Sequence, residues 1–406
     1  REDKQEAVKW YRLAADQGNA EAQRRLGNCY FWGEGIREDK REAVKWYRLA
    51  AEQGDAEAQK ELVDCYKQQG DCYFWGAGIR EDKQEAVKWY RLAADQGDAE
   101  AQRRLGYFYF WGEGIREDKQ EAVKWYRLAA DQGDAEAQKE LVDCYKQQGD
   151  CYFWGEGIRE DKQEAVKWYR LAAEQGDAEA QRILGACYYF GTGIREDKQE
   201  AVKWYRLAAE QKNSEARWRL GDCYFWGEGI REDKREAVKW YRLAAEQGNA
   251  KAQWRLGACY YFGTGIREDK QEAVKWFRLA AEQKNAEAQY SLGRCYYFGT
   301  GIREDKQEAV KWFRLAAEQE DAEAQWMLGD CYFFGHGVGK NKREAVNWYF
   351  LSAKKGNAEA QRRLGACFYF GHGVAKNRQE AIRWYRLAAE QGNSVAISML
   401  KKLGVM

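Results

Sequence analysis

Apolar and polar residues follow a helical rhythm that returns along the whole chain. The stretch Glu6 to Tyr11, which ends in a Trp-Tyr pair, recurs ten more times as Trp-Tyr or Trp-Phe, every 36 residues except for two steps of 43. A fixed period of this size is typical of two-helix units that cannot bury their apolar faces alone and therefore stack on their neighbours. The pattern predicts an all-α array of 11 units and about 22 antiparallel helices, with residues 1–406 as one domain.

Each unit contains two amphipathic segments. In the first helix, expected over residues 20–32, Ala22, Leu26 and Cys29 lie on one apolar stripe. In the second helix, expected between Asp3 and Gly18, apolar residues cover well over half of the circumference. We therefore expect the second helix to be packed on several sides, with its Trp-Tyr and Ala-Ala pairs buried.

The ends of both helices are encoded by capping residues. Asn19 is Asp or Asn in every unit, which suits an N-cap, and Asp3 with Glu6 forms a capping box in which the glutamate reaches back to the cap. Gly18 ends the second helix in the left-handed conformation. Three units carry another residue at this glycine position, and we expect a strain of about 1 kcal/mol there: Lys212, Lys284 and Glu320.

A further glycine, Gly27, falls inside the first helix. Glycine costs roughly 1 kcal/mol relative to alanine in a helix interior, so its presence predicts the close approach of a neighbouring backbone.

Taken together, these motifs resemble a known repeat family. The pattern is Ala22-x3-Leu26-Gly27-x2-Tyr30-x2-Gly33-x-Gly35, combined with Ala7-x2-Trp10-Tyr11-x2-Ala14-Ala15-x2-Gly18. It is similar to the Sel1-like repeat, a relative of the tetratricopeptide repeat, over essentially all of the chain. The resemblance implies a right-handed α/α superhelical solenoid that acts as an adaptor, of a kind common in bacterial envelope, signalling and host-interaction proteins. It does not identify the partner.

Two units are seven residues longer than the others, with insertions near 63–69 and 142–148. Seven residues are close to two helical turns, which add about 10 Å and rotate the apolar face by only ~20°. The spacing predicts two lengthened first helices. A bulged loop is the alternative, because Gly70 and Gly149 could break the helix.

Charge and hydropathy exclude several classes of partner. Lys and Arg number 67 against 66 Asp and Glu, so no overall field favours nucleic acid or an anionic membrane. No apolar stretch approaches the ~18 residues that a membrane-spanning helix needs, and we expect no direct membrane insertion.

The cysteines predict free thiols and no disulfide framework. There are 11, an odd number, and most occur singly on the apolar stripe of a first helix. Buried cysteines of this kind act as small apolar side chains. They favour a reducing compartment, with the bacterial envelope or secretion as the alternative.

The residue types and their spacing predict no catalytic residue, metal site or cofactor. The two histidines, His336 and His372, lie in the middle of Gly-x-Gly turns and are expected to be solvated. Ser398-Met399-Leu400-Lys401 matches a Ser-x-x-Lys motif, but no Ser-Asp-Asn or Lys-Thr-Gly accompanies it.

One outward position of the first helix changes character along the chain. We call its basic residues the basic ladder: Arg24, Lys60, Arg103, Lys139, Arg182 and Arg362. Its aromatic residues form the aromatic ladder: Trp218, Trp254, Tyr290 and Trp326. The resemblance implies that the first helix lines the concave groove of the solenoid, and adjacent units lie about 10 Å apart. We therefore expect these rows to face solvent and to bind a partner. The alternative is that the aromatic rings pack against one another between units.

These observations predict a non-catalytic scaffold that binds another protein or peptide through the concave face of the solenoid. Self-assembly into filaments by end-to-end stacking of repeats is one alternative. Glycan binding on the aromatic ladder is the other.

Overall fold

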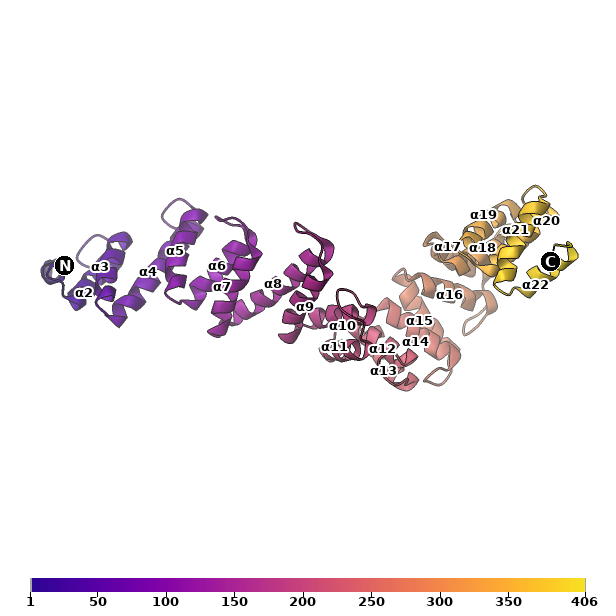
Figure 1. The fold of residues 1–406 in the computed structure, drawn as a ribbon, viewed down its shortest axis with the longest axis horizontal. Helices are drawn as coiled ribbons and strands as arrows, with labels where there is room; N and C mark the ends of the chain where they lie inside the picture. The colour runs from indigo at the N-terminus through magenta and orange to yellow at the C-terminus, as the bar shows by residue number, and fades with distance from the viewer. Residues whose placement is uncertain (1, 406) are drawn as a thin grey trace. The chain divides into compact units, whose positions relative to one another are not determined.

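In the computed structural model, residues 2–405 are described, and they form 22 α-helices and no strand (Figure 1). This confirms the all-α fold. The structure divides into two compact units, residues 1–180 and 181–406. That the repeats form one continuous array stays a prediction.

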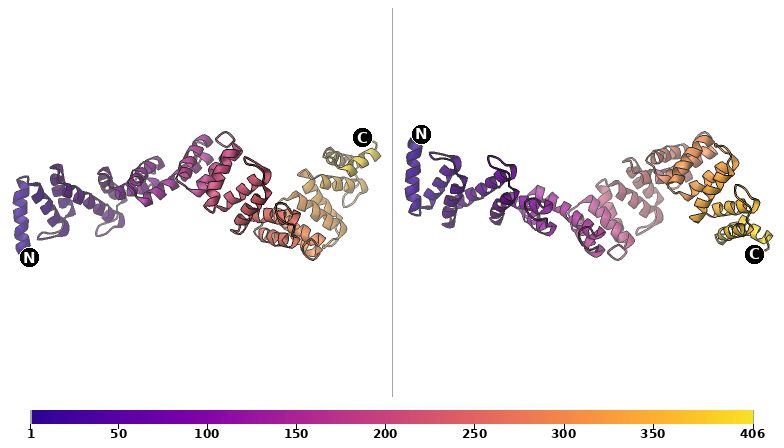
Figure 2. Two further views of the ribbon diagram at one scale, coloured as in Figure 1. Left: turned by 90° about the horizontal axis from the view of Figure 1, so that it is seen from below. Right: turned by 90° about the horizontal axis from the view of Figure 1, so that it is seen from above.

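Even-numbered helices are the first helices of the repeats and odd-numbered helices the second, and consecutive helices lie side by side within each unit (Figure 2). The first unit holds α1 (Glu2–Asp16), α2 (Ala20–Trp32), α3 (Lys40–Glu52), α4 (Ala56–Trp75), α5 (Lys83–Asp95), α6 (Ala99–Trp111), α7 (Lys119–Asp131), α8 (Ala135–Trp154) and α9 (Lys162–Glu174). The boundary between the units falls within α10 (Ala178–Phe190). The second unit continues with α11 (Lys198–Glu210), α12 (Ser214–Trp226), α13 (Lys234–Ala245), α14 (Ala250–Phe262), α15 (Lys270–Glu282), α16 (Ala286–Phe298), α17 (Lys306–Glu318), α18 (Ala322–Phe334), α19 (Lys342–Lys354), α20 (Ala358–Phe370), α21 (Arg378–Glu390) and α22 (Ser394–Lys402).

The N-caps of the second helices satisfy half of the expected capping box. Asp39 accepts hydrogen bonds from the backbone N–H groups of Arg41 and Glu42, each at 3.0 Å. The backbone N–H of Asp39 donates to the carbonyl oxygen of Tyr30 at 2.9 Å. Because that donor is already satisfied, Glu42 does not reach back to the cap as expected, and it pairs with Lys45 at 2.6 Å.

The turns after the second helices adopt the left-handed backbone that the sequence predicts. Gly18 has a φ of 87°, and the three residues that replace this glycine, Lys212, Lys284 and Glu320, have φ values of 66°, 64° and 68°. A side chain at such a φ brings Cβ close to the carbonyl oxygen, so these three turns carry strain.

The helical glycine of each repeat lies under an aromatic ring. A Cβ atom added at Gly27 would lie 2.7 Å from the ring atoms Cδ1 and Cε1 of Tyr47, which is fully buried on α3. At Gly221 the nearest atoms are again in a ring, that of Tyr241, followed by the backbone oxygen of Ala237 at 3.4 Å. The close neighbour is thus an aromatic side chain first, and a backbone only second, where the sequence had suggested a backbone.

The two residues of each Trp-Tyr pair have different roles. Tyr241 is fully buried against its own first helix, as expected. Trp240 is only half-buried, and it packs against a cluster that joins Val202 of α11, in the preceding repeat, to Leu220 of α12, in its own repeat. The expectation that both residues are buried was therefore wrong for Trp240, because this ring bridges the groove between repeats, but it holds for Trp384, which is buried.

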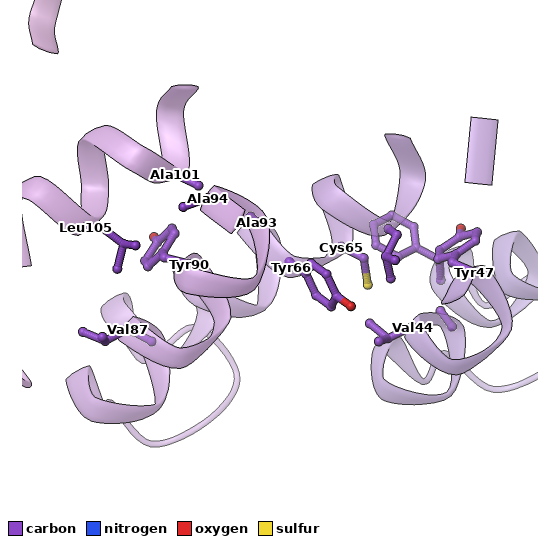
Figure 3. Close-up of a cluster of buried hydrophobic side chains, with 14 of the residues drawn as sticks. Val44, Tyr47, Cys65, Tyr66, Val87, Tyr90, Ala93, Ala94, Ala101 and Leu105 are labelled. Atoms are coloured by element: carbon purple, nitrogen blue, oxygen red, sulfur yellow. The ribbon is translucent and has the colours of Figure 1, made fainter. Parts of the chain in front are cut away.

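The insertions lengthen two helices. α4 and α8 each contain 20 residues, against 13 in α2, so the prediction of a lengthened first helix is confirmed. In Figure 3, Cys65 and Tyr66 of α4 lie between a group around Tyr47 of α3 and a group around Tyr90 of α5. The ring of Tyr90 covers Gly70, at 2.9 Å from its added Cβ. The start of α4 therefore packs on the preceding helix and its end on the following one.

All 11 cysteines are free, and only Cys72 and Cys151 are partly exposed. Burial raises the pKa of Cys187 to about 11 and that of Cys65 to about 12. These thiols stay protonated at neutral pH, as expected for apolar core residues.

The contact between ring and glycine predicts whether a substitution at this glycine stabilises or destabilises the protein. Gly221→Ala should destabilise the protein by about 1–3 kcal/mol, because the added methyl overpacks against Tyr241. Helix propensity alone would give a gain of roughly 1 kcal/mol. The control is Gly339→Ala, since nothing lies within 4 Å of that position. Urea unfolding measures both, and a more stable Gly221→Ala variant would contradict the account.

The left-handed turns can be tested by a reciprocal exchange. Lys284→Gly should stabilise the protein by about 1 kcal/mol by relieving the positive φ, and Gly248→Lys, at the same turn of the preceding repeat, should destabilise it by a similar amount. Thermal unfolding of both variants checks the opposite signs. Shifts in the same direction would show that backbone strain does not determine these turns.

Candidate functional site

The basic ladder of the first unit forms ion pairs within the chain. Arg24 Nε lies 3.3 Å from Oδ2 of Asp55, the N-cap of the next first helix, α4. The other carboxylate oxygen of Asp55 accepts the backbone N–H of Ala58 at 2.9 Å. Arg103 and Asp134 repeat the arrangement at 3.4 Å. Each cap thus uses one oxygen for the helix end and the other for a cation from the preceding repeat.

The two long helices shift this ion pair to a residue that the sequence analysis missed. Lys60 and Lys139 are exposed. Two turns later along α4, Lys67 Nζ lies 3.2 Å from Oδ2 of the cap Asp98. In the same way, Lys146 Nζ on α8 lies 3.0 Å from Oδ2 of the cap Asp177. The signal was present in the sequence, because each of these cations precedes its cap by 31 residues, as Arg24 does.

The remaining two members of the basic ladder lie in the second unit. Arg182 is half-buried on α10. Arg362 donates from Nε to its own neighbour Glu359 at 2.9 Å, and the next cap, Asn393, carries no charge.

The aromatic ladder does not face solvent as expected. Trp218 is only 8% exposed, and Trp254, Tyr290 and Trp326 are half-buried. These side chains lie where one first helix packs on the next repeat: Trp218 belongs to the core formed by α13 and α14, and Trp254 Nε1 donates to Ser291 Oγ on α16 at 3.2 Å. The prediction of an exposed row was wrong because this helix face meets the following repeat. A binding role for these residues stays a prediction.

The N-caps change together with the ladder. The cap 31 residues after each tryptophan of the aromatic ladder is a neutral asparagine: Asn249, Asn285 and Asn357. An asparagine still caps its helix, and its amide can donate; Asn357 Nδ2 binds Glu323 at 2.7 Å. Because an indole ring cannot neutralise a carboxylate, the neutral cap avoids an unpaired charge.

Tyr290 is the exception, since it is followed by a charged cap, Asp321. One oxygen of Asp321 accepts the backbone N–H of Ala324 at 2.7 Å. Among the described residues, no basic side chain lies within 4.0 Å of its carboxylate. Burial raises the pKa of Asp321, and the negative charge of Glu287 raises it further. Burial also raises the pKa of Glu323, and Asp321 adds to that rise.

A pocket of about 310 Å³ opens at this exception, which is within the usual range of roughly 300–1,000 Å³ for ligand sites. Its aromatic walls include Trp254, Tyr290 and Phe262, and Phe262 is 67% exposed. Its polar lining consists of Glu287, Ser291, Arg294, Asp321 and Glu323. Arg294 lies over the ring of Tyr290, with 5.7 Å from Cζ to the ring centre. All of these residues come from α14, α16 and α18 or the turn before α18 (Figure 1).

Phe262 belongs to an exposed aromatic row that the sequence analysis did not single out. Each first helix from α2 to α20 ends in an exposed aromatic side chain: Trp32, Trp75, Trp111, Trp154, Phe190, Trp226, Phe262, Phe298, Phe334 and Phe370. Each of these rings rests edge-on against the ring before it, as Phe262 does on Tyr261 at 4.9 Å and 73°. The aromatic residue before every Gly-x-Gly turn is the sequence signal. Exposed apolar surface of this kind marks interaction sites.

The histidines are less solvated than expected. His336 Nδ1 lies 2.6 Å from the hydroxyl of Tyr297 in the preceding repeat, and the ring of His336 stacks on Phe334 at 5.6 Å. His372 stacks on Phe370 in the same way, at 5.7 Å. These turn residues connect adjacent repeats, which the sequence did not reveal.

Within residues 2–405, no group of three or more His, Cys, Asp or Glu side chains is placed to hold a metal ion. None of the helices in that range is both long and apolar enough to cross a membrane.

Comparison with known proteins identifies the repeat. The sequence model of the Sel1 repeat matches residues 1–19, 20–55, 70–98, 99–134, 149–177, 178–213, 214–249, 250–285, 286–321, 322–357 and 358–393. The chain belongs to the Sel1 repeat family. Sel1 repeat proteins are generally non-catalytic scaffolds for protein interaction. The unmatched stretches between these ranges, 56–69 and 135–148, contain the two insertions, and residues 394–406 are also unmatched.

Solved structures of bacterial Sel1 repeat proteins resemble the chain. One is c5321, described as a protective antigen of uropathogenic Escherichia coli; it is 31% identical, with 98% of this chain and 90% of that one covered, at a TM-score of 0.56. Another is a Sel1 repeat protein from Oxalobacter formigenes, also 31% identical, with 78% and 90% covered, at a TM-score of 0.59. A search of curated proteins found no match.

The shifted ion pair of the long Sel1 repeats can be tested with two lysines of one helix. Lys67→Ala should destabilise the first unit by about 0.5–1 kcal/mol, because it removes a cation that forms ion pairs with Asp98 and Glu100. Lys60→Ala, on the same helix but exposed, should change stability by less than about 0.5 kcal/mol. Urea unfolding compares the two. A larger loss of unfolding free energy for Lys60→Ala than for Lys67→Ala would contradict the assignment of the ion pair to Lys67.

Proposed function

We propose that this Sel1 repeat protein is a non-catalytic scaffold that binds a partner protein or peptide on the first helices of its second unit. The binding surface consists of the pocket beside Trp254 and Tyr290 together with the exposed ring of Phe262. The observation that carries the proposal is this pocket, which combines aromatic walls with the charged groups of Glu287, Arg294, Asp321 and Glu323.

The surface has the composition of a binding hot spot. Aromatic side chains contribute a large contact area, and an apolar centre surrounded by polar groups is typical of the residues that dominate affinity. Phe262 offers the exposed ring, while Trp254 and Tyr290 are half-buried and therefore held in place by the repeats. A side chain that is already ordered loses little conformational entropy on binding.

The aromatic ladder is thereby divided into two parts. Trp218 is buried in the core of α13 and α14, so it supports the fold. Trp326 packs between the cores on both sides of α18. We assign binding to Trp254 and Tyr290, and support of the surface to Trp218 and Trp326.

Site-specific photo-cross-linking tests the proposal. The photoreactive residue p-benzoylphenylalanine replaces Phe262 in the full chain, expressed in the cells that make the protein. The matched control places it at Leu279, which is 44% exposed on the second helix that follows. We expect one defined protein adduct from position 262 and none from position 279, with the adduct identified by mass spectrometry.

Three other results would overturn the proposal. Equal adducts from both positions, or none from either, would mean that this face does not select a partner. A cross-link between two copies of this chain would favour self-assembly. Specific capture of an oligosaccharide by the surface, without a protein adduct, would favour glycan binding.

A further inference from the structure

We propose that the pocket between α14, α16 and the start of α18 receives the side chain of an arginine or lysine from the partner protein. The cation would bind Asp321 and lie against the rings of Trp254 and Tyr290. This inference rests on the proposed function and specifies what the partner must carry.

The chain itself shows how a cation fits at this place in a repeat. In the first unit, Arg24 and Arg103 stand at the ladder position, and the Nε atom of each binds Oδ2 of the next cap, at 3.3 and 3.4 Å. In the repeat of Asp321 the ladder position is Tyr290, which cannot supply a positive charge. The cap keeps its carboxylate, and no described cation pairs with it within 4.0 Å; Lys355, whose positive charge acts on Asp321, pairs with Glu320 at 2.8 Å.

A second comparison, between adjacent repeats, points to the same vacancy. Over the ring of Trp218 lies Lys251, with Nζ 4.5 Å from the ring centre. The residue 36 positions later, beside Trp254, is Glu287. A carboxylate thus replaces the second of the two cations that lie over the ladder ring one repeat earlier. The first has its counterpart in Arg255, whose Cζ lies 4.8 Å from the ring centre of Trp254. Cations over an indole face are favourable, especially where water is excluded.

The charges around the pocket favour a positive guest. Three carboxylates, those of Glu287, Asp321 and Glu323, line it together with the single guanidinium of Arg294. In the part of the chain that the structure describes, none of the three carboxylates belongs to an ion pair within 4.0 Å. Glu323 accepts a hydrogen bond from Asn357, and Arg294 lies over Tyr290. An incoming cation would gain a charge-assisted hydrogen bond to Asp321 without displacing an existing ion pair.

The pocket suits a long side chain with a charged end. Arginine and lysine combine an apolar stem with a polar head, so the stem can contact Phe262 and Trp254 while the head reaches the carboxylates. The planar guanidinium also stacks on aromatic faces, which an ammonium group does less well. We therefore expect arginine to bind at least as tightly as lysine.

Titration of the full chain with short peptides tests the inference. The probes are acetylated pentapeptide amides of sequence Gly-Gly-X-Gly-Gly, where X is Arg, Lys, Gln or Glu. Binding is followed by NMR on the indole N–H signal of Trp254, assigned as the signal lost in Trp254→Phe. We expect millimolar dissociation constants for Arg and Lys, because a single side chain buries little area, and binding weaker by about tenfold or more for Gln and Glu.

Two substitutions should change the affinity for the Arg peptide in opposite directions. Asp321→Asn should weaken it by about tenfold, and the fold should persist because asparagine is the native cap at this place in the preceding and following repeats. Arg294→Ala should strengthen it, because a competing positive charge is removed. The control is Asp134→Asn, the same change at a cap that already has its own arginine, which should leave affinity unaltered.

Equal affinity for the Arg and Gln peptides, or an Asp321→Asn variant that binds the Arg peptide normally, would overturn the inference. The proposed function would survive either result, because the cross-link from position 262 does not depend on a basic residue. If the peptides behave as expected but no cross-link forms, the pocket selects cations and the scaffold proposal fails.

Discussion

The stacking of an aromatic ring on a helical glycine sets the geometry of every repeat. The ring of Tyr47 leaves no room for a Cβ at Gly27, and the same contact joins Tyr241 to Gly221 and Tyr90 to Gly70. It determines how closely a first helix approaches the second helix that follows. Since each repeat packs only on its neighbours, the half-buried tryptophans and the N-caps can then reach the adjacent repeat at constant positions. Without this contact the distance between the two helices would change, and with it the positions of the tryptophans and the N-caps.

A second constraint links one repeat to the next through charge. In the first unit, cap aspartates such as Asp55 bind a cation supplied 31 residues earlier, and in the second unit most caps are neutral where the cation has become an aromatic ring. Among the caps that follow an aromatic ladder residue, Asp321 is the one that keeps its charge, and the pocket lies beside it. A site that departs from an otherwise regular pattern is where function is expected to lie.

Much of the fold could be predicted from the sequence, because period, caps and glycines are local signals. The left-handed backbone at Lys284 follows from its position in the repeat, and the seven-residue spacing favoured a lengthened α4 over a bulged loop. The burial of Trp218 could not be read in this way, since a helical wheel shows which face is apolar but not that the adjacent repeat covers the outward position. Lys60 was assigned to the basic ladder by counting from the start of its helix, whereas counting back 31 residues from the cap Asp98 gives Lys67, which forms the ion pair.

The candidate site was predicted only in part. Trp254 and Tyr290 were identified by residue type, but the pocket depends on how three helices meet, which the sequence does not specify. Phe262 was overlooked because it is the aromatic end of a repeated motif and resembles its counterparts in every repeat. Asp321 is one of several aspartate caps of first helices in the sequence, and it differs from the others in following an aromatic ladder residue, Tyr290.

The most direct test of this account is a crystal structure of the chain at low salt with N-acetylarginine amide. The account predicts a guanidinium within ion-pair distance of the Asp321 carboxylate, against the rings of Trp254 and Tyr290. It would be contradicted if Arg294 turned to bind Asp321 and closed the pocket, because the vacancy left by the missing ladder cation would then be filled by the chain itself.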